Sequence, residues 1–259
     1  MVANYHTHTS RCHHATGLDE EYIKKAITEG VKILGFSDHA PFFYENGYLS
    51  YYKMLPEEAA DYYKSISLLR EKYRDKIEIY IGYETEYYPQ IWDRTFEFWR
   101  RESSPEYLIL GQHMIGEEHD VFTRIPSARP NTAVREYVSQ TIAGIETGVF
   151  SYLAHPDLVN YIGPDEVYEE EMTRLILAAG KADLALEINM LGLIERRNYP
   201  RDFFWEIASK HEPRVILGCD AHNPERVADK EEILTALRFA EKHRLNVVDT
   251  IELKNPFKQ

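Results

Sequence analysis

Seven short apolar runs, each followed by a segment whose apolar residues have helical spacing, constrain the fold of this chain more than any other feature. The apolar runs cover residues 2–7, 33–37, 77–84, 107–112, 152–154, 184–189 and 215–218. The helical segments cover residues 19–29, 56–73, 91–101, 132–146, 165–179, 201–211 and 229–244. Apolar strands that alternate with amphipathic helices predict a mostly parallel sheet covered by helices, and seven such units favour a β/α barrel over an open sheet.

The composition predicts one folded domain that spans residues 1–259. No Gly-, Pro- or Ser-rich stretch marks a linker, and hydrophobic residues make up 44% of the chain, which is enough for a buried core. No stretch approaches the roughly 18 apolar residues of a membrane span, and the N-terminus lacks the pattern of a signal peptide. We therefore expect a cytoplasmic protein without membrane contact, in which Cys12 and Cys219 are reduced.

The formal net charge of −13 argues against partners that are extended polyanions. Lys and Arg are scattered along the chain rather than gathered into a stripe, so nucleic acid is not expected as a partner. A small anionic substrate would have to be attracted locally, and bound divalent ions can do this because they are the largest charges in such a site. The sequence leaves the oligomeric state open.

Candidate metal ligands follow six of the seven predicted strands. They are His6, His8, His39, Glu84, His113, His155, Asp220 and His222. In a parallel barrel the carboxyl ends of the strands converge on one face, so these side chains are predicted to become neighbours. His6 and His8, like Asp220 and His222, are separated by one residue and point to the same side of an extended chain. Each histidine alone could simply be a partly buried, hydrogen-bonded side chain, but the whole set predicts a metal site.

The donor types indicate which metals such a site would take. Imidazole and carboxylate donors together suit Zn, Fe or Mn, whereas Ca²⁺ prefers a set made only of oxygen atoms. The two cysteines lie at opposite ends of the chain and do not form the cluster typical of structural zinc. The site is therefore predicted to be catalytic.

The order of these residues resembles the PHP (polymerase and histidinol phosphatase) family. The motifs that carry the resemblance extend over almost the whole chain: His6-Thr7-His8-Thr9, then His14, Asp38-His39, Glu84, His113, His155 and Asp220-Ala221-His222. Within the family, the chain is most similar to the stand-alone histidinol-phosphate phosphatases. This narrower similarity rests on Cys12 followed by His14, on Ser37-Asp38-His39-Ala40-Pro41, and on Glu187-Ile188-Asn189 ahead of Gly192-Leu193.

The resemblance implies an α/β fold, a distorted (β/α)7 barrel similar to a TIM barrel, that holds two or three divalent metal ions (Zn, Fe or Mn). It implies that the first ion is bound by His6, His8, Glu84 and Asp220. The second ion would be bound by Glu84, His113 and His155, so that Glu84 bridges the two. The third ion would be bound by His14, His39 and His222.

For two of these predicted metal ligands, a nearby residue of the same type is an alternative. His13 directly precedes His14, and the family spacing of six residues after His8 favours His14. Glu86 lies on the same side of its strand as Glu84, and the Gly-x-Glu position favours Glu84.

Three side chains outside the ligand set are candidates for other roles at the site. Asp38, which we group with Glu84 and Asp220 as a catalytic residue, would orient a ligand or move a proton. The proton donor to the leaving alcohol is left open between Asp38 and a metal-bound water. Arg196 and Arg197 follow the sixth strand, and a guanidinium can grip two phosphate oxygens at once. The alternative for either arginine is an exposed charge beside a helix.

Aromatic residues gather in two predicted loops on the same face of the barrel. They are Phe42, Phe43, Tyr44, Tyr87 and Tyr88. Such side chains either form the wall of a small pocket or pack beneath the loops.

Together these features predict a metal-dependent phosphomonoesterase. A hydroxide that bridges two ions would be available near neutral pH, because coordination lowers the pKa of water from about 15.7 to about 7, and it would attack phosphorus in line. The resemblance implies histidinol phosphate as the small phosphorylated substrate, converted to histidinol and phosphate in histidine biosynthesis. One alternative is a PHP-type nuclease or nucleotide phosphatase, and another is a non-catalytic binding module of the same fold.

Overall fold

The computed structural model describes residues 1–44, 47–118, 121–122 and 130–258, and within these residues eight parallel strands form one sheet. The spatial order is β1-β2-β3-β4-β7-β8-β9-β10, so neighbouring strands follow one another along the chain. The strands are β1 (Ala3–Asn4), β2 (Ile33–His39), β3 (Glu78–Thr85), β4 (Tyr107–Leu110), β7 (Tyr152–Leu153), β8 (Ala185–Asn189), β9 (Arg214–Gly218) and β10 (Asn246–Val247). The first seven correspond to the seven apolar runs, which confirms the predicted strands.

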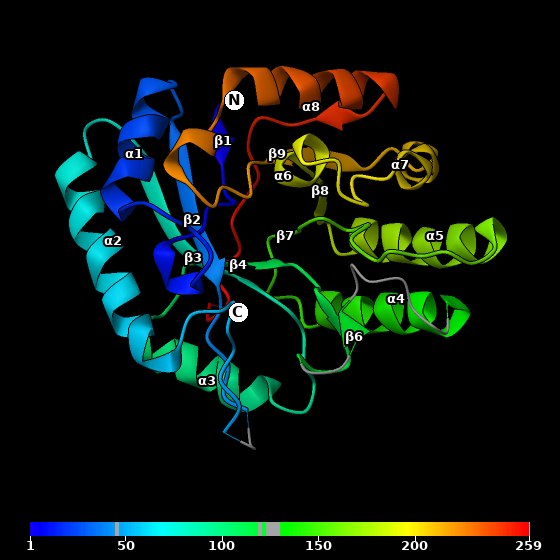
Figure 1. Ribbon diagram of the computed structural model, residues 1–259, viewed down its shortest axis with the longest axis horizontal. Coiled ribbons are helices and arrows are strands. Elements are labelled where there is room, and N and C mark those ends of the chain that lie inside the picture. Colours follow the sequence, from blue (N-terminus) through cyan, green and yellow to red (C-terminus); the bar gives the residue numbers. More distant parts are fainter. Residues whose placement is uncertain (45–46, 119–120, 123–129, 259) are drawn as a thin grey trace.

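The sheet curls until its first and seventh strands meet at their carboxyl ends. Thr7 forms a parallel bridge with Ala221, and the backbone N–H of Cys219 donates a hydrogen bond to Asn4 Oδ1 at 3.0 Å. At the opposite end, β10 pairs with β9 and continues the sheet past this seam. Figure 1 shows the strands in the middle of the molecule with the helices around them. The predicted distorted (β/α)7 barrel is confirmed.

In the part of the chain that the structure describes, seven helices of eight or more residues connect the strands. They are α1 (Asp19–Thr28), α2 (Ala59–Tyr73), α3 (Trp92–Glu102), α4 (Pro130–Glu146), α5 (Asp165–Lys181), α7 (Asp202–Ser209) and α8 (Lys230–Lys242). Each lies within a few residues of its predicted position, because its apolar residues recur at helical spacing. In α3, for example, Trp92, Thr95 and Trp99 are buried at intervals of three and four, whereas Arg100 and Arg101 are exposed.

The elements that the sequence pattern missed are all short. They are β10, the helix α6 (Met190–Ile194), the hairpin β5 (Met114–Ile115) and β6 (Val121–Phe122), and the 3-10 turns η1 (Ser10–Cys12), η2 (Pro56–Glu58) and η3 (Pro224–Arg226). Elements of two to five residues are too short for a hydrophobic period to develop. Helix α6 instead begins with a local cap, in which Asn189 Oδ1 accepts a hydrogen bond from the N–H of Gly192 at 2.9 Å.

Two apolar cores support the carboxyl face of the barrel. The larger core lies between the sheet and the helices, and a smaller one fills the barrel interior. The interior core contains Tyr107, whose hydroxyl donates a hydrogen bond to the carbonyl of Tyr5 at 2.8 Å, and a Cβ at Gly82 would overlap the Tyr107 ring. Ile251 and Leu253 of the C-terminal segment pack against this core. The filled interior leaves the carboxyl ends of the strands as the place for a site.

None of the helices that the structure describes is both long and apolar enough to cross a bilayer.

Candidate active site

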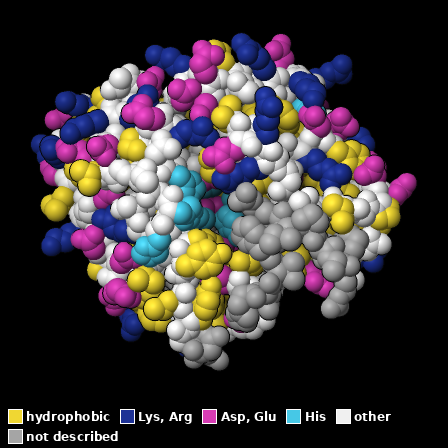
Figure 2. All heavy atoms as spheres, in the orientation of Figure 1, with side chains coloured by type: hydrophobic (Ala, Val, Ile, Leu, Met, Phe, Trp, Pro, Cys, Tyr) yellow, Lys and Arg dark blue, Asp and Glu magenta, His cyan; other side chains and the backbone are white. Residues whose placement is uncertain are grey.

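A hollow lined by histidines opens on the carboxyl face of the barrel. In Figure 2 the histidine side chains gather around it near the middle of the molecule. The cavity has a volume of about 610 Å³, within the range of roughly 300–1,000 Å³ for small-molecule sites. Its lining includes six of the nine predicted metal ligands: His14, His39, Glu84, His113, Asp220 and His222. The other three, His6, His8 and His155, lie beneath it and are almost completely buried.

Glu84, at the carboxyl end of β3, lies at the centre of the cluster. The register of β2 on β3 places His39 directly beside it. Its atom Oε1 lies 2.6 Å from His155 Nε2 and 3.5 Å from His113 Nε2. Its atom Oε2 lies 3.1 Å from His39 Nδ1, 3.4 Å from His6 Nε2 and 3.5 Å from His8 Nε2. The two oxygens therefore face different sets of imidazoles, as a bridging carboxylate requires.

The donor atoms around Glu84 fit metal ions. His6 Nε2, His8 Nε2 and His39 Nδ1, the nitrogens that face Glu84 Oε2, are buried and have no hydrogen-bond partner among the described residues. Buried polar atoms without partners are costly, and an ion between them and the carboxylate would satisfy all three. Tetrahedral coordination at roughly 2.1 Å places donors about 3.4 Å apart, close to the separations observed. The donor set therefore fits divalent cations.

A second carboxylate, Asp220, closes the same side of the cluster. Its Oδ1 lies 3.0 Å from His8 Nε2 and 3.6 Å from His6 Nε2, and Asn189 donates a hydrogen bond to its Oδ2 at 3.1 Å. Burial alone would raise the pKa of Asp220, but the neighbouring histidines hold it well below its usual range. Conversely, burial alone would lower the pKa of His6, but Glu187, Asp220 and Glu84 raise it to about 10. The carboxylates thus favour positive charge on this inner side of the cluster, around His6.

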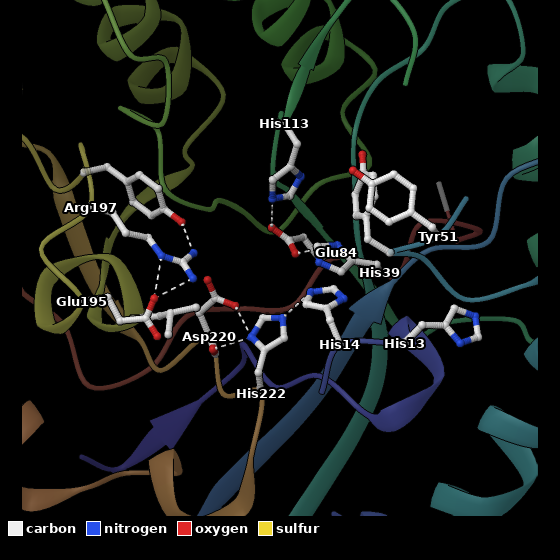
Figure 3. A pocket seen from close by; sticks show the side chains of 13 residues that line it. His13, His14, His39, Tyr51, Glu84, His113, Glu195, Arg197, Asp220 and His222 are labelled. Carbon is white, nitrogen blue, oxygen red and sulfur yellow. Dashed lines mark hydrogen bonds and ion pairs between the residues drawn. The ribbon is translucent and has the colours of Figure 1, made fainter. Parts of the chain in front are cut away.

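A third group of donors lies at the surface of the cluster. His14, His39 and His222 can each offer a ring nitrogen, and these atoms lie within 4.8 Å of one another. His14 Nε2 and His222 Nε2 are 2.9 Å apart. His13 has a left-handed backbone conformation (φ 64°) and also lines the cavity, but its Nε2 lies 3.5 Å from Glu58 and belongs to none of the donor groups among the described residues. Figure 3 shows His14 beside His222, with His13 apart from them. The family spacing therefore favoured His14, the histidine that lies within the cluster. The role of His14 as a metal ligand stays a prediction.

Three buried carboxylates hold the outer nitrogens of predicted ligands. His6 Nδ1 lies 2.7 Å from Glu187 Oε1, His8 Nδ1 lies 3.3 Å from Asp38 Oδ1, and His113 Nδ1 lies 2.9 Å from Glu86 Oε1. Such contacts fix the tautomer and the ring orientation, leaving the other nitrogen for the metal. Burial raises the pKa of Glu86, but Lys53 and His113 outweigh it, so the net shift is downward.

The structure separates the two roles considered for Asp38. The side chain is completely buried, does not line the cavity, and accepts a hydrogen bond from the Thr9 hydroxyl. Its position therefore fits orientation of His8 rather than delivery of a proton to a bound ester.

Sequence reasoning named Glu187 only as part of the Glu187-Ile188-Asn189 motif and missed its contact with His6. The sixth strand, β8, supplied no predicted ligand, yet it carries this carboxylate, which also accepts a hydrogen bond from the backbone N–H of His155 at 3.0 Å. Besides that motif, the signal for such a role was an acidic residue within an otherwise apolar run, because a charge in such a position is almost always paired. Gly218 leaves room for it, because a Cβ there would overlap the carboxylate. Gly111 does the same for Glu84.

The structure distinguishes the two candidate arginines. Arg197 lines the cavity, where Glu195 Oε2 accepts a hydrogen bond from its Nε at 2.9 Å and the Tyr199 hydroxyl accepts one from Nη1 at 2.9 Å. Figure 3 shows the guanidinium reaching toward the cluster from the side opposite Tyr51. Arg196 is exposed and does not line the cavity. Of the two, Arg197 is therefore the one placed to meet a ligand in the cavity.

The aromatic loops mostly pack inward. Phe42, Tyr44 and Tyr88 belong to the buried core, and none of the five candidate aromatic residues lines the cavity. Its aromatic wall is formed by three others, Tyr51, Tyr52 and Tyr199.

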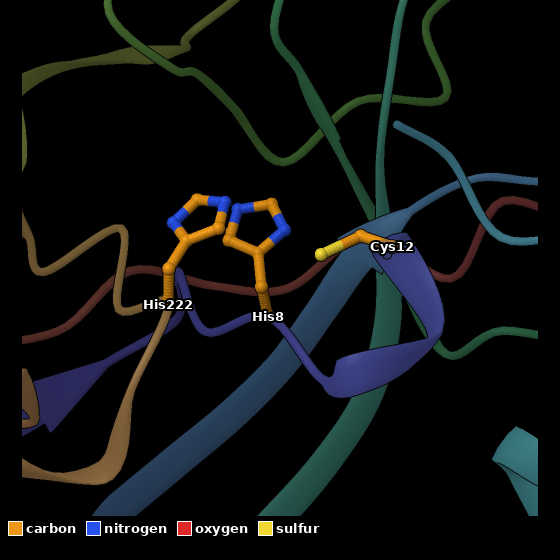
Figure 4. Close-up of side chains that lie close together, drawn as sticks. All are labelled: His8, Cys12 and His222. Atoms are coloured by element: carbon orange, nitrogen blue, oxygen red, sulfur yellow. The ribbon is translucent and has the colours of Figure 1, made fainter. Parts of the chain in front are cut away.

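Cys12 is buried and its thiol is free, as the expectation of reduced cysteines requires, and it lies beside the cluster. Figure 4 shows its sulfur pointing toward His8, whose ring stacks on that of His222 with centroids 4.0 Å apart. Its thiol donates a hydrogen bond to the carbonyl of Thr9 at 3.1 Å. Burial raises the pKa of this thiol to about 11.

Comparison with known proteins identifies similar chains. The family model described as "PHP domain" matches residues 4–190. A protein of Deinococcus radiodurans named "Probable histidinol-phosphatase" is 26% identical over 235 residues, which cover 87% of this chain and 88% of that protein. The histidinol-phosphatase of Lactococcus lactis is 26% identical over 236 residues, which cover 86% of this chain and 85% of that protein.

The fold is shared with a solved structure. The crystal structure of histidinol phosphate phosphatase from Lactococcus lactis, complexed with zinc, L-histidinol and phosphate, matches with a TM-score of 0.73 and 20% sequence identity. The match covers 96% of this chain and 98% of that one.

Proposed function

Because the chain belongs to the PHP domain family, we propose that it is a metal-dependent phosphomonoesterase that hydrolyses histidinol phosphate to histidinol and phosphate. The observation that carries this proposal is the position of Glu84, whose two oxygens face two separate sets of imidazole nitrogens. The proposed substrate is based on the relatives. Two proteins whose names describe histidinol phosphatases match this chain over most of their own length. The related Lactococcus lactis enzyme binds zinc, L-histidinol and phosphate.

Three groups of side chains would hold the metal ions. His6, His8, Glu84 and Asp220 would hold the first ion, Glu84, His113 and His155 the second, and His14, His39 and His222 the third. Divalent ions bound there supply Lewis-acid chemistry, because they lower the pKa of a coordinated water and offset the charge of a phosphoryl group.

The remaining residues of the site bind and orient. Glu187, Asp38 and Glu86 would keep the imidazoles in the tautomers that leave their inner nitrogens free for the metals. Arg197 would donate hydrogen bonds to the phosphoryl oxygens, a task for which the planar guanidinium suits two oxygens at once. Tyr51 and Tyr199 would cover the organic part of the ester.

The cavity favours a small substrate over a polynucleotide. Among the described residues that line it, Arg197 is the one Lys or Arg side chain. Polynucleotide binding relies on many such contacts along the phosphate backbone. We therefore do not propose a nuclease, and the absence of a nucleic-acid partner stays a prediction.

The test compares phosphate release from L-histidinol phosphate with release from glucose 6-phosphate and cleavage of a single-stranded oligonucleotide. The purified protein is assayed before and after chelation, and its metals are quantified by elemental analysis. We expect at least two bound ions, the highest kcat/KM for histidinol phosphate, and activity that chelation abolishes and Zn²⁺ or Mn²⁺ restores. A protein that retains no metal and releases no phosphate would refute the proposal, as would faster cleavage of the oligonucleotide.

A further inference from the structure

Lys53 is a completely buried cation directly behind the predicted metal ligands. Its ammonium forms an ion pair with Glu86 and lies 3.7 Å from Glu118 Oε2. It also faces the ring of Phe42 at 5.0 Å and that of Tyr52 at 5.0 Å. A buried ammonium is costly unless it is paired and hydrogen-bonded. The position of Lys53 is therefore closely specified by its surroundings.

Glu86 connects Lys53 to the cluster. Its Oε2 contacts Lys53, and its Oε1 lies 2.9 Å from His113 Nδ1. The other ring nitrogen of His113 lies 3.5 Å from Glu84 Oε1. Because both oxygens of Glu86 are engaged, its carboxylate cannot rotate without losing a contact. Lys53 thus fixes the Glu86 carboxylate, and that carboxylate contacts the His113 imidazole.

This contact matters most at one end of the cluster. Two imidazoles face Glu84 Oε1, those of His113 and His155. His155 Nδ1 has no hydrogen-bond partner among the described residues, so no described side chain fixes this ring by a hydrogen bond to its outer nitrogen. Of this pair, His113 is the ring whose outer nitrogen a carboxylate holds, that of Glu86.

We propose that Lys53 is a positioning residue that acts through Glu86 to fix the His113 imidazole and thereby strengthens metal binding at the Glu84–His113–His155 end of the site. This inference rests on the proposed function, because it assumes that the cluster binds metal. The Lys53–Glu86 pair would differ from an ordinary buried ion pair because it affects metal binding as well as stability. A purely structural pair would affect unfolding, whereas a positioning pair also changes the metal affinity of the folded protein.

The experiment measures Zn²⁺ affinity by competition with a chromophoric chelator, starting from metal-free full-length protein. The variants are Lys53→Met, Glu86→Gln and the double variant with both changes. Lys72→Met is the matched control, because it removes an exposed lysine that pairs with Glu20 at 2.5 Å, on the outer surface of α2. Thermal unfolding of each metal-free protein shows that the measurement is made on folded protein.

We expect each single variant to bind one equivalent of Zn²⁺ about 10- to 100-fold more weakly, the usual effect of removing a partner behind a ligand. The tighter equivalent should keep its affinity, and Lys72→Met should match wild type. The double variant should be no weaker than the weaker single variant, because both residues act along one path. Wild-type affinity in Lys53→Met would overturn the inference.

If Lys53→Met does not fold, the double variant tests the role of Lys53 instead. It removes both members of the pair and so leaves neither with a buried unpaired charge. Binding of one equivalent that is as weak as in Glu86→Gln supports the inference, because Lys53 then acts through Glu86, and either wild-type affinity or a further loss beyond Glu86→Gln overturns it. Failure of the proposed function is a different result, in which the wild-type protein itself binds no Zn²⁺.

Discussion

Glu187 Oε1 lies 2.7 Å from His6 Nδ1, although the two residues are 181 positions apart in the sequence. The contact joins β8 to the segment that follows β1. It occupies the outer nitrogen of His6 and leaves Nε2 facing Glu84 and Asp220. The second oxygen of Glu187 accepts hydrogen bonds from the backbone of His155 and from Asn189, both at 3.0 Å. One carboxylate thus fixes two parts of the site.

Glu187→Gln is therefore expected to weaken metal binding without unfolding the protein. The amide has nearly the same size, so the close approach of Gly218 is preserved, but the negative charge on His6 is lost. We expect Zn²⁺ affinity to fall about 10- to 100-fold, measured by chelator competition. Glu78→Gln, an exposed position at the start of β3, serves as the control. Unchanged affinity in Glu187→Gln would show that His6 needs no partner.

Much of the fold could be predicted because its strands are buried on both faces. Each of the seven strands is a nearly continuous apolar run, and each long helix repeats its apolar residues at helical spacing. The remaining elements depend on contacts that no local pattern encodes. The position of β10, for example, is fixed by pairing with Arg214 and Val215 of β9.

The site could be predicted in part, for a similar reason. The candidate ligands follow strand ends, and the barrel topology brings strand ends together. Their partners follow no such rule, since Glu187 lies within a strand and Lys53 lies in a loop. Arg196 and Arg197 are adjacent, so the sequence could not separate them. Their directions diverge because Arg196 adopts a left-handed backbone conformation (φ 52°).

His155→Ala is expected to lower kcat for histidinol phosphate by orders of magnitude, because its Nε2 lies 2.6 Å from Glu84 Oε1 and the loss of a ligand disables the metal chemistry. The fold should persist, since the side chain contributes little to either apolar core. The measurements are steady-state kinetics and bound metal per chain. His211→Ala, at an exposed position after α7, should retain full activity. Wild-type turnover by His155→Ala would refute its assignment as a ligand.

The two adjacent arginines provide a matched pair. Arg197→Ala removes a guanidinium from the cavity, and the loss of charged hydrogen bonds should lower kcat/KM by roughly 10- to 100-fold. Arg196→Ala removes the same group from the exposed neighbouring position and should leave kcat/KM unchanged. If the two substitutions have equal effects on kcat/KM, Arg197 does not contact the substrate.

A fourth prediction concerns stability and pH, away from the site. Asp202, the first residue of α7, accepts hydrogen bonds from Lys242 at 2.5 Å and from His243 at 2.7 Å. Lys242 in particular lowers the pKa of Asp202 below its ordinary value of 3.8, and His243 adds to this effect, whereas partial burial opposes it. A depressed carboxyl pKa stabilises the fold at pH values above the unfolded pKa, and this stabilisation is lost as the pH falls through the folded pKa.

Asp202→Asn should therefore lower the free energy of unfolding at pH 7 by a few tenths to about 1 kcal/mol, the range for exposed ion pairs. The difference from wild type should shrink as the pH falls below 3.8, because the wild-type carboxylate is then progressively protonated. Urea unfolding of metal-free protein at several pH values measures this difference, and Asp75→Asn, an exposed position, should show little change. A deficit that stays constant with pH would mean that the carboxylate charge is not its cause.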